Sequence, residues 1–255
     1  MHLILTGATG LVGSAVLDAM LKSTSVSKIS ILSRSPVRMA EDAKDSRVHV
    51  ITHKDFESYK PELLDQLKDA DGCVWALGTS QTNVTKDRQY ITITKDYTLA
   101  AANAFSTIKP SDHPFRFIHV SGEGATQNPG IFSPIFARVK GETEMLLGTL
   151  SEQTPSLRVD SVRPAFVDSV THDAIKPYIP SNGVTGIVSK VGMAVLGPGI
   201  RYLMKSMHSP TEHLGSFLTD MAMGRFEGKL EGPGAFRMGG SYVVGNSGMR
   251  RILGI

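Results

Sequence analysis

The stretch "ILTGATGLVGSAVL", residues 4–17, decides the fold of this chain. It runs from an apolar segment through a turn with Gly7, Gly10 and Gly13 into a segment of helical period. In a strand–turn–helix unit, the first glycine permits a tight turn, the second lets a pyrophosphate approach the backbone, and the third lets helix and strand pack closely. A glycine-rich connection that binds no ligand is the alternative. The order of strand, turn and helix favours a dinucleotide site.

Short apolar runs alternate along the chain with longer segments of helical period. Neighbouring parallel strands need crossover helices, so the alternation predicts an α/β fold, a Rossmann doubly wound parallel sheet with a small C-terminal substrate lobe. The predicted strands are residues 2–6, 29–33, 48–52, 72–77, 115–120 and 157–163. The predicted helices are residues 11–22, a segment that begins near Pro61, about 90–107 and about 135–150.

The pattern loosens beyond residue 164 into segments punctuated by glycine and proline, without a clean linker. We therefore predict a single NAD(P)-binding Rossmann domain over residues 1–255. Residues 168–255 are expected to form, in part, a lobe that covers the substrate.

The composition is typical of a globular protein, with 41% hydrophobic residues, 20% charged residues and a net charge of +3. The charges are spread without a run of one sign, which argues against nucleic-acid binding. Because Cys73 is the only cysteine, no internal disulfide can form, and a reducing compartment, the cytoplasm, is expected. The N-terminus opens directly into "HLILTG", so no signal peptide is expected.

Residues 183–200 are the most membrane-like stretch, but Lys190, Pro198 and several glycines argue against a spanning helix. The overlapping methionine-rich stretch 191–208 is compatible with plain core, a substrate lid, a dimer face or a membrane-surface segment. The sequence therefore leaves a homodimer and a peripheral membrane contact open.

His208, Glu212 and His213 follow no metal-ligand spacing. Pro210 predicts the start of a helix there instead. No metal site is expected.

The end of the second predicted strand bears on the choice of cofactor. It reads "LSRSPVR", residues 32–38, and no carboxylate follows before Glu41. An acidic residue here suits the free 2′-hydroxyl of NAD, whereas a basic one suits the 2′-phosphate of NADP. Arg34, assisted by Ser33 and Arg38, favours NADP, and a solvated arginine is the alternative.

Six segments carry a resemblance that extends from residue 2 to about residue 225. They are "GATGLVG" (7–13), "ALGTS" (76–80), "TKDYTLAAANA" (94–104), "HVSGEGA" (119–125), "ARVKGETE" (137–144) and "VRPAFV" (162–167). With these motifs the chain resembles the atypical or extended short-chain dehydrogenase/reductases, specifically the Tat-interacting oxidoreductase-like group and its fungal relatives of the mitochondrial outer membrane.

The resemblance implies a Rossmann-fold oxidoreductase that binds NADP. Asp55 and Phe56 would lie near the adenine, the residues after the fourth strand would line the cofactor, and those after the sixth would contact its nicotinamide end. The expected cofactor-binding residues are Gly7, Thr9, Gly10, Leu11, Val12, Gly13, Ser33, Arg34, Asp55, Phe56, Ala76, Leu77, Gly78, Thr79, Lys140, Pro164, Ala165 and Val167.

Active members of such families combine a serine, a tyrosine and a lysine. The tyrosine exchanges a proton with the substrate oxygen, the lysine lowers the phenol pKa and holds the ribose, and the serine orients the carbonyl. By resemblance, Ser121 and Lys140 are the catalytic serine and lysine, whereas the tyrosine position falls on Phe136. A positioned acid is worth roughly 10²- to 10⁴-fold in rate, so ordinary carbonyl reduction should suffer while cofactor binding persists.

Other side chains are candidates to replace the missing phenol. They are Tyr90, Tyr97, Tyr178, His119, Glu123 and Thr126. His119 lies inside a strand and is expected to be packed or hydrogen-bonded, and Glu123 is expected to be solvated. Lys140 could be a helix-surface lysine, but its place in "VKGE" favours the ribose contact.

Two functions remain in competition. The first is an NADP-dependent enzyme that acts on a small carbonyl-containing metabolite without the usual tyrosine, either as a reductase or as a non-redox isomerase or cyclase. The second is a non-catalytic protein that senses NADP and binds a partner. For either one the cytoplasm is the expected location, and the resemblance adds the surface of the mitochondrial outer membrane as the alternative.

Overall fold

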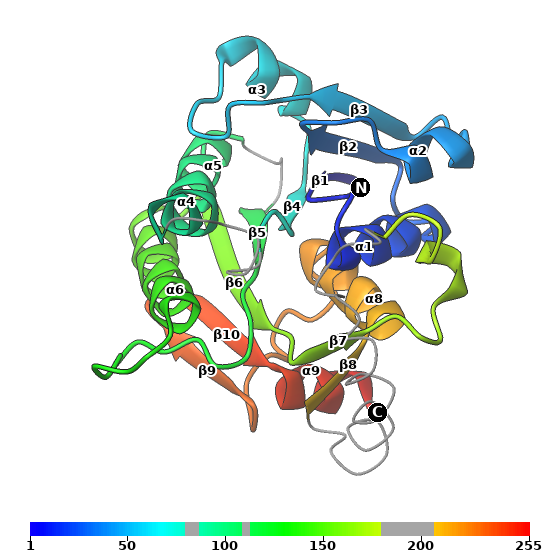
Figure 1. Ribbon diagram of the computed structural model, residues 1–255. Coiled ribbons are helices and arrows are strands. Elements are labelled where there is room, and N and C mark those ends of the chain that lie inside the picture. Colours follow the sequence, from blue (N-terminus) through cyan, green and yellow to red (C-terminus); the bar gives the residue numbers. More distant parts are fainter. Residues whose placement is uncertain (80–86, 109–112, 180–206) are drawn as a thin grey trace.

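The predicted parallel sheet is present in the computed structural model, which describes residues 1–79, 87–108, 113–179 and 207–255. The eight strands lie in the order β3-β2-β1-β4-β5-β6-β10-β9, and only β9 runs antiparallel to its neighbour (Figure 1). Their bounds are β1 His2–Thr6, β2 Lys28–Ser33, β3 Val48–Thr52, β4 Gly72–Trp75, β5 Phe115–Val120, β6 Leu157–Arg163, β9 Ala235–Met238 and β10 Ser241–Gly245. The six predicted strands and the α/β Rossmann class are therefore confirmed, although β4 ends two residues earlier than expected.

The central strands are apolar along their whole length because both faces of the sheet are covered. All five residues of β1 are buried, and β1 pairs in parallel with β2 on one side and β4 on the other. Crossover helices fill the two faces. They are α1 Leu11–Lys22, α2 Arg38–Ala43, α3 Pro61–Leu67, α4 Asp87–Ile91, α5 Tyr97–Phe105, α6 Ile135–Gln153, α8 Thr211–Ala222 and α9 Asn246–Leu253.

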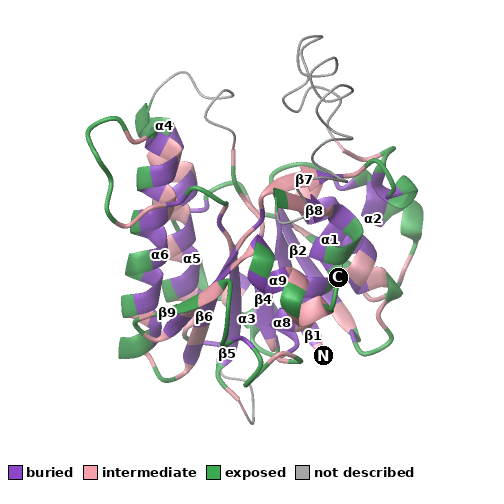
Figure 2. Ribbon diagram, turned by 90° about the horizontal axis from the view of Figure 1, so that it is seen from below, coloured by how far each residue is buried: buried purple, intermediate pink, exposed green. Residues whose placement is uncertain are grey.

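The two faces carry different helices, as Figures 1 and 2 both show: α1 and α8 cover one, and α4, α5 and α6 the other. Helix α8 packs closely on α1, since a Cβ on Gly215 would lie 2.3 Å from the carbonyl oxygen of Ala15. The helix predicted over about 90–107 is interrupted. A π-helical turn, η2 Thr92–Asp96, joins α4 to α5, and such turns are frequent at functional sites.

The later part of the chain belongs to the same layers. Strand β10 pairs in parallel with β6, and β9 closes that edge. Two short strands, β7 Phe166–Asp168 and β8 His208–Pro210, form a separate pair, and a 3₁₀ turn, η3, covers Asp173–Ile175. The lobe expected over residues 168–255 thus shares β9, β10, α8 and α9 with the Rossmann layers. Helix α8 begins directly after Pro210, as predicted.

Residues 180–206 lie outside the described part of the chain. The membrane-like stretch 183–200 and most of the methionine-rich stretch 191–208 fall there, so their expected roles stay predictions. Within the described residues, no helix is both long and apolar enough to cross a membrane.

Aromatic side chains fill the core between the sheet and α5. Trp75 is fully buried, stacks on Phe117 and donates a hydrogen bond to Thr98 Oγ1 (2.9 Å). Phe56 packs edge-on against Trp75. Cys73 is buried in the same cluster.

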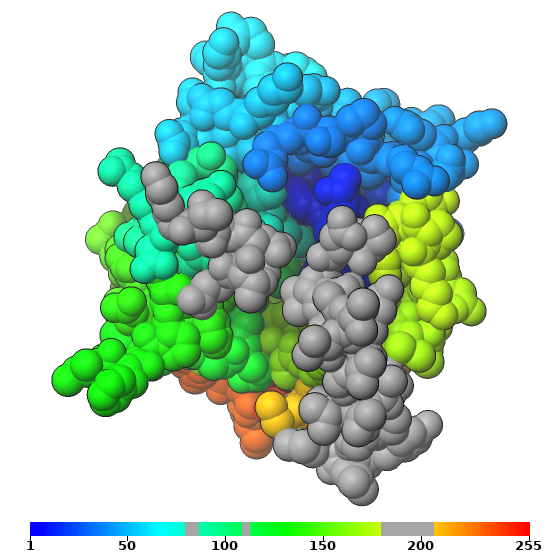
Figure 3. Space-filling view, viewed as in Figure 1, coloured from blue at the N-terminus to red at the C-terminus, as the bar shows by residue number. Residues whose placement is uncertain are grey.

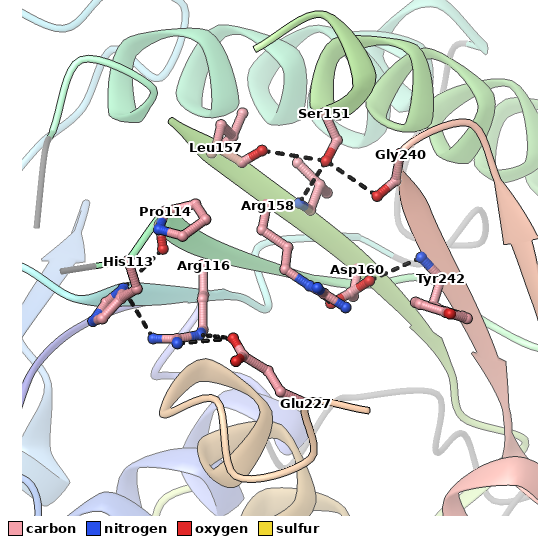
Figure 4. A network of polar contacts seen from close by, with 11 residues as sticks. His113, Pro114, Arg116, Ser151, Leu157, Arg158, Asp160, Glu227, Gly240 and Tyr242 are labelled. Carbon is pink, nitrogen blue, oxygen red and sulfur yellow. Dashed lines mark hydrogen bonds and ion pairs between the residues drawn. The ribbon is translucent and has the colours of Figure 1, made fainter. Parts of the chain in front are cut away.

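Polar side chains tie the strands together at the amino ends of β5, β6 and β10 (Figure 4). The guanidinium of Arg116 donates two hydrogen bonds to Glu227, which follows α8 (2.9 and 2.8 Å). Asp160 on β6 pairs with Arg158 (3.2 Å) and accepts the main-chain N–H of Tyr242 on β10 (2.8 Å). We call these five residues the amino-edge network. It fastens the C-terminal elements to the sheet.

Candidate functional site

The glycine turn after β1 has the geometry that its sequence predicts. Gly7 adopts φ +71°, and a Cβ there would lie 2.3 Å from the carbonyl oxygen of Ala76. A Cβ on Gly13 would lie 1.9 Å from the carbonyl oxygen of Gly7. Helix α1 begins at Leu11, and no side chain caps its start. Its first main-chain N–H groups can therefore donate hydrogen bonds to an anionic group such as a pyrophosphate.

A cleft of about 670 Å³ opens beside this turn, at the carboxyl ends of the strands. It is lined by Gly10, Leu11, Val12, Ala76, Leu77, Gly78, Thr79, Val120, Ser121, Gly122, Glu123, Lys140, Pro164, Ala165, Phe166, Val167 and Met207. Ligands of open α/β sheets bind in such crevices. The cleft brings together most of the expected cofactor residues with both expected catalytic residues. Phe166 belongs to the run after the sixth strand that the resemblance implies at the nicotinamide end, and Met207 belongs to the methionine-rich stretch for which a substrate lid was one alternative; neither was singled out as a site residue.

The remaining expected cofactor residues lie outside this cleft. Thr9 borders a second cavity of about 450 Å³, together with Arg38 and Lys176. Arg34 is exposed at the end of β2, and Ser33 Oγ donates to the carbonyl oxygen of Ser35 (2.7 Å). Figure 3 shows the dark-blue N-terminal residues in a hollow between the blue β2–α2 region and the yellow-green segment.

Asp55 and Phe56 follow β3, and neither side chain lines either cavity. Asp55 Oδ1 accepts the main-chain N–H of Glu57 (3.1 Å). Phe56 is 1% exposed and packs in the aromatic core. Only the main chain of Phe56 is therefore left for a ligand.

Ser121 follows β5 directly, and its hydroxyl is an unusual feature of the cleft. The side chain is buried, and Oγ has no hydrogen-bond partner among the described residues. Buried polar atoms nearly always have a partner, because leaving one unpaired costs free energy. Because Ser121 also lines the cleft, this hydroxyl is a candidate group for a ligand contact.

Lys140 reaches the same place from α6. Its Nζ donates a hydrogen bond to the main-chain oxygen of Ser121 (2.5 Å). Burial lowers the pKa of Lys140 to about 8, and the charge of Glu144 one turn later opposes that shift. The helix comes this close because position 141 is glycine: a Cβ on Gly141 would lie 1.9 Å from the carbonyl oxygen of Thr126. Lys140 is therefore a cleft residue and not a solvated helix-surface lysine.

Phe136 lies one helical turn before Lys140 but does not line the cleft. A Cβ on Gly124 would lie 3.5 Å from the Phe136 ring, so the ring packs against the loop after Ser121. Tyr90 is buried beside Ile135 in a cluster that includes Phe136.

The other candidate tyrosines also point elsewhere. Tyr97 packs near Phe56 (ring centroids 6.0 Å), and Tyr178 borders the second cavity. None of the tyrosines that the structure describes lines the cleft.

The three remaining candidates for a replacement acid have other partners. His119 is buried, its Nδ1 lies 3.2 Å from Ser161 Oγ, and burial together with the charge of Lys140 lowers its pKa to about 3. Glu123 is exposed, as predicted, but its Oε1 also accepts the main-chain N–H of Asn246 at the start of α9 (2.8 Å). Thr126 Oγ1 accepts the N–H of Asn128 (3.2 Å).

Two curated fungal proteins are similar to this chain in sequence. Leucinostatins biosynthesis cluster protein T of Purpureocillium lilacinum is 35% identical over 88% of this chain and 85% of its own length. Botcinic acid biosynthesis cluster B protein 16 of Botryotinia fuckeliana (strain B05.10) is 43% identical over 62% of this chain and 98% of its own length. The chain belongs to the family of these two proteins. We call it the cluster-protein family.

Solved structures place this member of the cluster-protein family among known folds. An oxidoreductase of the short-chain dehydrogenase/reductase family from Burkholderia thailandensis superposes with a TM-score of 0.64 at 13% identity, over 97% of this chain and 92% of that chain. This likeness shows the fold. No family model matches the chain. Over the described residues, no group of three or more His, Cys, Asp or Glu side chains is placed to hold a metal ion.

Proposed function

We propose that this protein is an NADP-binding, short-chain dehydrogenase/reductase-like enzyme that acts on a small carbonyl-containing metabolite in a fungal biosynthetic cluster. The observation that carries the proposal is the unpaired Ser121 hydroxyl beside the buried Lys140 ammonium, in a cleft next to the glycine turn. The names of the two relatives, which refer to botcinic acid and leucinostatins, support a role in secondary metabolism.

The residues around the cleft fit a nicotinamide dinucleotide. The glycine turn and the start of α1 would hold the pyrophosphate, and Lys140 with Pro164, Ala165 and Val167 would hold the nicotinamide end. When bound, the reduced nicotinamide supplies a hydride. Ser121 Oγ would donate a hydrogen bond to the substrate carbonyl and orient it for that transfer.

Three cations support NADP over NAD. Arg34 follows β2 with no carboxylate in the chain before Glu41, and Arg38 and Lys176, the latter paired with Asp173, border the second cavity beside Thr9. A 2′-phosphate in that region would meet positive charge, which NAD would leave unused. Fluorescence titration with NADPH and NADH tests this assignment. We expect NADPH to bind more tightly, and Arg34→Ala to weaken NADPH about tenfold and NADH little. Arg225→Ala, remote on the surface, is the control, and equal affinities that do not respond to Arg34→Ala would refute NADP preference.

Turnover of a panel of aldehydes, ketones and polyketide-like carbonyl compounds tests the enzymatic role. Reduction is followed by NADPH absorbance, and isomerisation or cyclisation by chromatography of the products. We expect Ser121→Ala and Lys140→Ala to abolish the activity found. Rates that survive both substitutions would refute the proposed site.

A non-catalytic role is the second candidate, and the position of Phe136 favours it. If Phe136 replaces the family tyrosine, the cofactor site persists without the usual acid. Such a protein would bind a partner in response to NADP, as the resemblance to the Tat-interacting group suggests. Pull-down with and without NADPH separates the two roles: a partner that binds only with nucleotide, without any turnover, would favour the sensor.

A further inference from the structure

The proposed reaction needs a proton donor at the substrate oxygen, and the described wall of the cleft offers few. Ser121 has a hydroxyl but no base or acid bonded to it among the described residues. Glu123 Oε1 already accepts a hydrogen bond from the main-chain N–H of Asn246 at the start of α9. Lys140 remains. An ammonium group has three donors, and the structure gives one of them to the main-chain oxygen of Ser121.

Lys140 and Ser121 are joined closely enough to act on the same ligand atom. The Nζ–O hydrogen bond links the lysine to the residue whose own hydroxyl is unpaired (2.5 Å). A Cβ on Gly122 would lie 3.3 Å from Nζ, so the ammonium lies over the strand end where a side chain would otherwise stand. The ammonium therefore lies in the cleft wall, bonded to the main chain of the residue whose own hydroxyl is unpaired among the described residues.

Among the described residues, no carboxylate forms an ion pair with the Lys140 ammonium, because the acidic side chains near it have other partners. On α6, Glu144 is held by Arg163 from β6 (2.5 and 2.8 Å) and by Gln127 (2.7 Å). Also on α6, Glu142 pairs on the surface with Lys95 from η2 (2.9 Å).

Two further titratable groups lie on the neighbouring elements. On β5, His119 is neutral at physiological pH because burial lowers its pKa. In the loop, Glu123 bonds Asn246. A lysine without a close counter-ion in a partly dry site releases its proton more readily than one in water.

We propose that Lys140 is itself the general acid, delivering its Nζ proton directly to the substrate oxygen that Ser121 Oγ holds. This inference rests on the proposed function and names the proton source of that site. In the step, the carbonyl carbon gains the hydride that the cofactor supplies. One Nζ–H bond breaks, an O–H bond forms on the substrate oxygen, and the lysine is left as a neutral amine. A proton from solvent restores the ammonium.

The mechanism predicts a pH profile. The acid must be protonated, and burial lowers the pKa of Lys140 to about 8. The rate of reduction is therefore level below about pH 8 and falls tenfold for each pH unit above it. A lysine that only holds the ribose would not cause this fall in kcat above pH 8.

The test compares Lys140→Arg with the wild type. Arginine keeps the positive charge and can hold the ribose, but it does not release a proton near neutral pH. We expect NADPH affinity within about threefold of the wild type, kcat lower by roughly 10²- to 10⁴-fold, and no fall in kcat above pH 8. Lys95→Arg is the matched control, because Lys95 lies on η2 and pairs with an exposed glutamate. It should leave kcat and the pH profile unchanged.

A second measurement needs no turnover. In protein with ¹³C-labelled lysine, the Cε resonance that disappears in Lys140→Arg should titrate near pH 8. Titration of Lys140 at its ordinary pKa, or a Lys140→Arg variant with wild-type kcat and pH profile, overturns the acid role while leaving the enzymatic role intact. Absence of turnover by the wild type on the whole panel overturns both.

Discussion

Polar side chains at the amino ends of the strands differ from those at the carboxyl ends in how they are hydrogen-bonded. At the amino edge, Arg116 and Asp160 are bonded to Glu227, Arg158 and the backbone of Tyr242 (Figure 4). At the carboxyl edge, Ser121 has an unpaired hydroxyl, and the Lys140 ammonium has only a main-chain oxygen in the cleft. The amino-edge network is hydrogen-bonded within the protein and contributes stability. The carboxyl edge is left for a ligand and contributes function, at some cost in stability.

Two buried serines make this comparison sharp. Ser121 and Ser241 are 2% and 1% exposed, and neither hydroxyl has a partner among the described residues. Ser241 begins β10 at the amino edge and does not line the cleft, whereas Ser121 does. Both serines therefore have a buried hydroxyl without a partner among the described residues, but only Ser121 lines the cleft.

The largest effect is expected from Ser121→Ala. Loss of the hydroxyl should lower kcat/KM at least 10²-fold, which corresponds to about 2.7 kcal/mol of transition-state stabilisation. The melting temperature should not fall, because an unpaired buried hydroxyl is removed. Ser241→Ala is the matched control and should also not lower the melting temperature, while kcat/KM stays at the wild-type value. A similar loss of activity in both variants would contradict the comparison.

Arg116→Met should lower the stability of the fold and leave the binding of NADPH unchanged. The Arg116 side chain is 9% exposed and bonds Glu227, so its loss should destabilise the fold by about 2 kcal/mol. The affinity for NADPH should stay unchanged, since the amino edge is remote from the cleft. Urea unfolding and nucleotide titration measure the two quantities. Arg225→Met removes an exposed pair with Asp220 and should cost about 0.5 kcal/mol or less. Equal destabilisation by both substitutions would argue against a structural role of the network.

The smallest effect is on the free energy of unfolding, which His119 should lower only at acidic pH. The folded pKa of His119 is about 3 against an ordinary value of 6.5, so below pH 6.5 the unfolded chain binds a proton that the folded protein refuses. Stability is therefore lost as pH falls from 6.5 toward 3, by up to about 1.4 kcal/mol per pH unit. Urea unfolding between pH 7.5 and 4.5 should show this slope in the wild type and a shallower one in His119→Gln. Parallel curves would show that His119 is protonated in the folded protein.

The sequence predicts the first six strands well because each is a local feature, an apolar run bounded by turn residues. Strands β9 and β10 were not predicted. Residues 235–238 and 241–245 are short and flanked by glycine, and they join the sheet through the pairing of β10 with β6, which lies far away in sequence. Their membership of the sheet becomes visible only in three dimensions.

The candidate site divides in the same way. The family resemblance implied that Ser121 and Lys140 act together, and both residues line the cleft. The motifs did not reveal that Ser121 Oγ is unpaired or that Glu123 binds the start of α9, since both depend on residues far away in sequence. They also did not reveal that the Phe136 ring lies outside the cleft wall. Such facts depend on side-chain direction, which spacing alone does not define.

The contact between α1 and α8 has a consequence for synthesis on the ribosome. Gly215 sits against Ala15, about 200 residues earlier in the chain. While the protein emerges, the apolar side of α1 has no native cover until α8 has been made. The nascent chain must therefore keep this surface away from other chains for most of its synthesis, and translation speed and chaperone supply should limit the yield of folded protein.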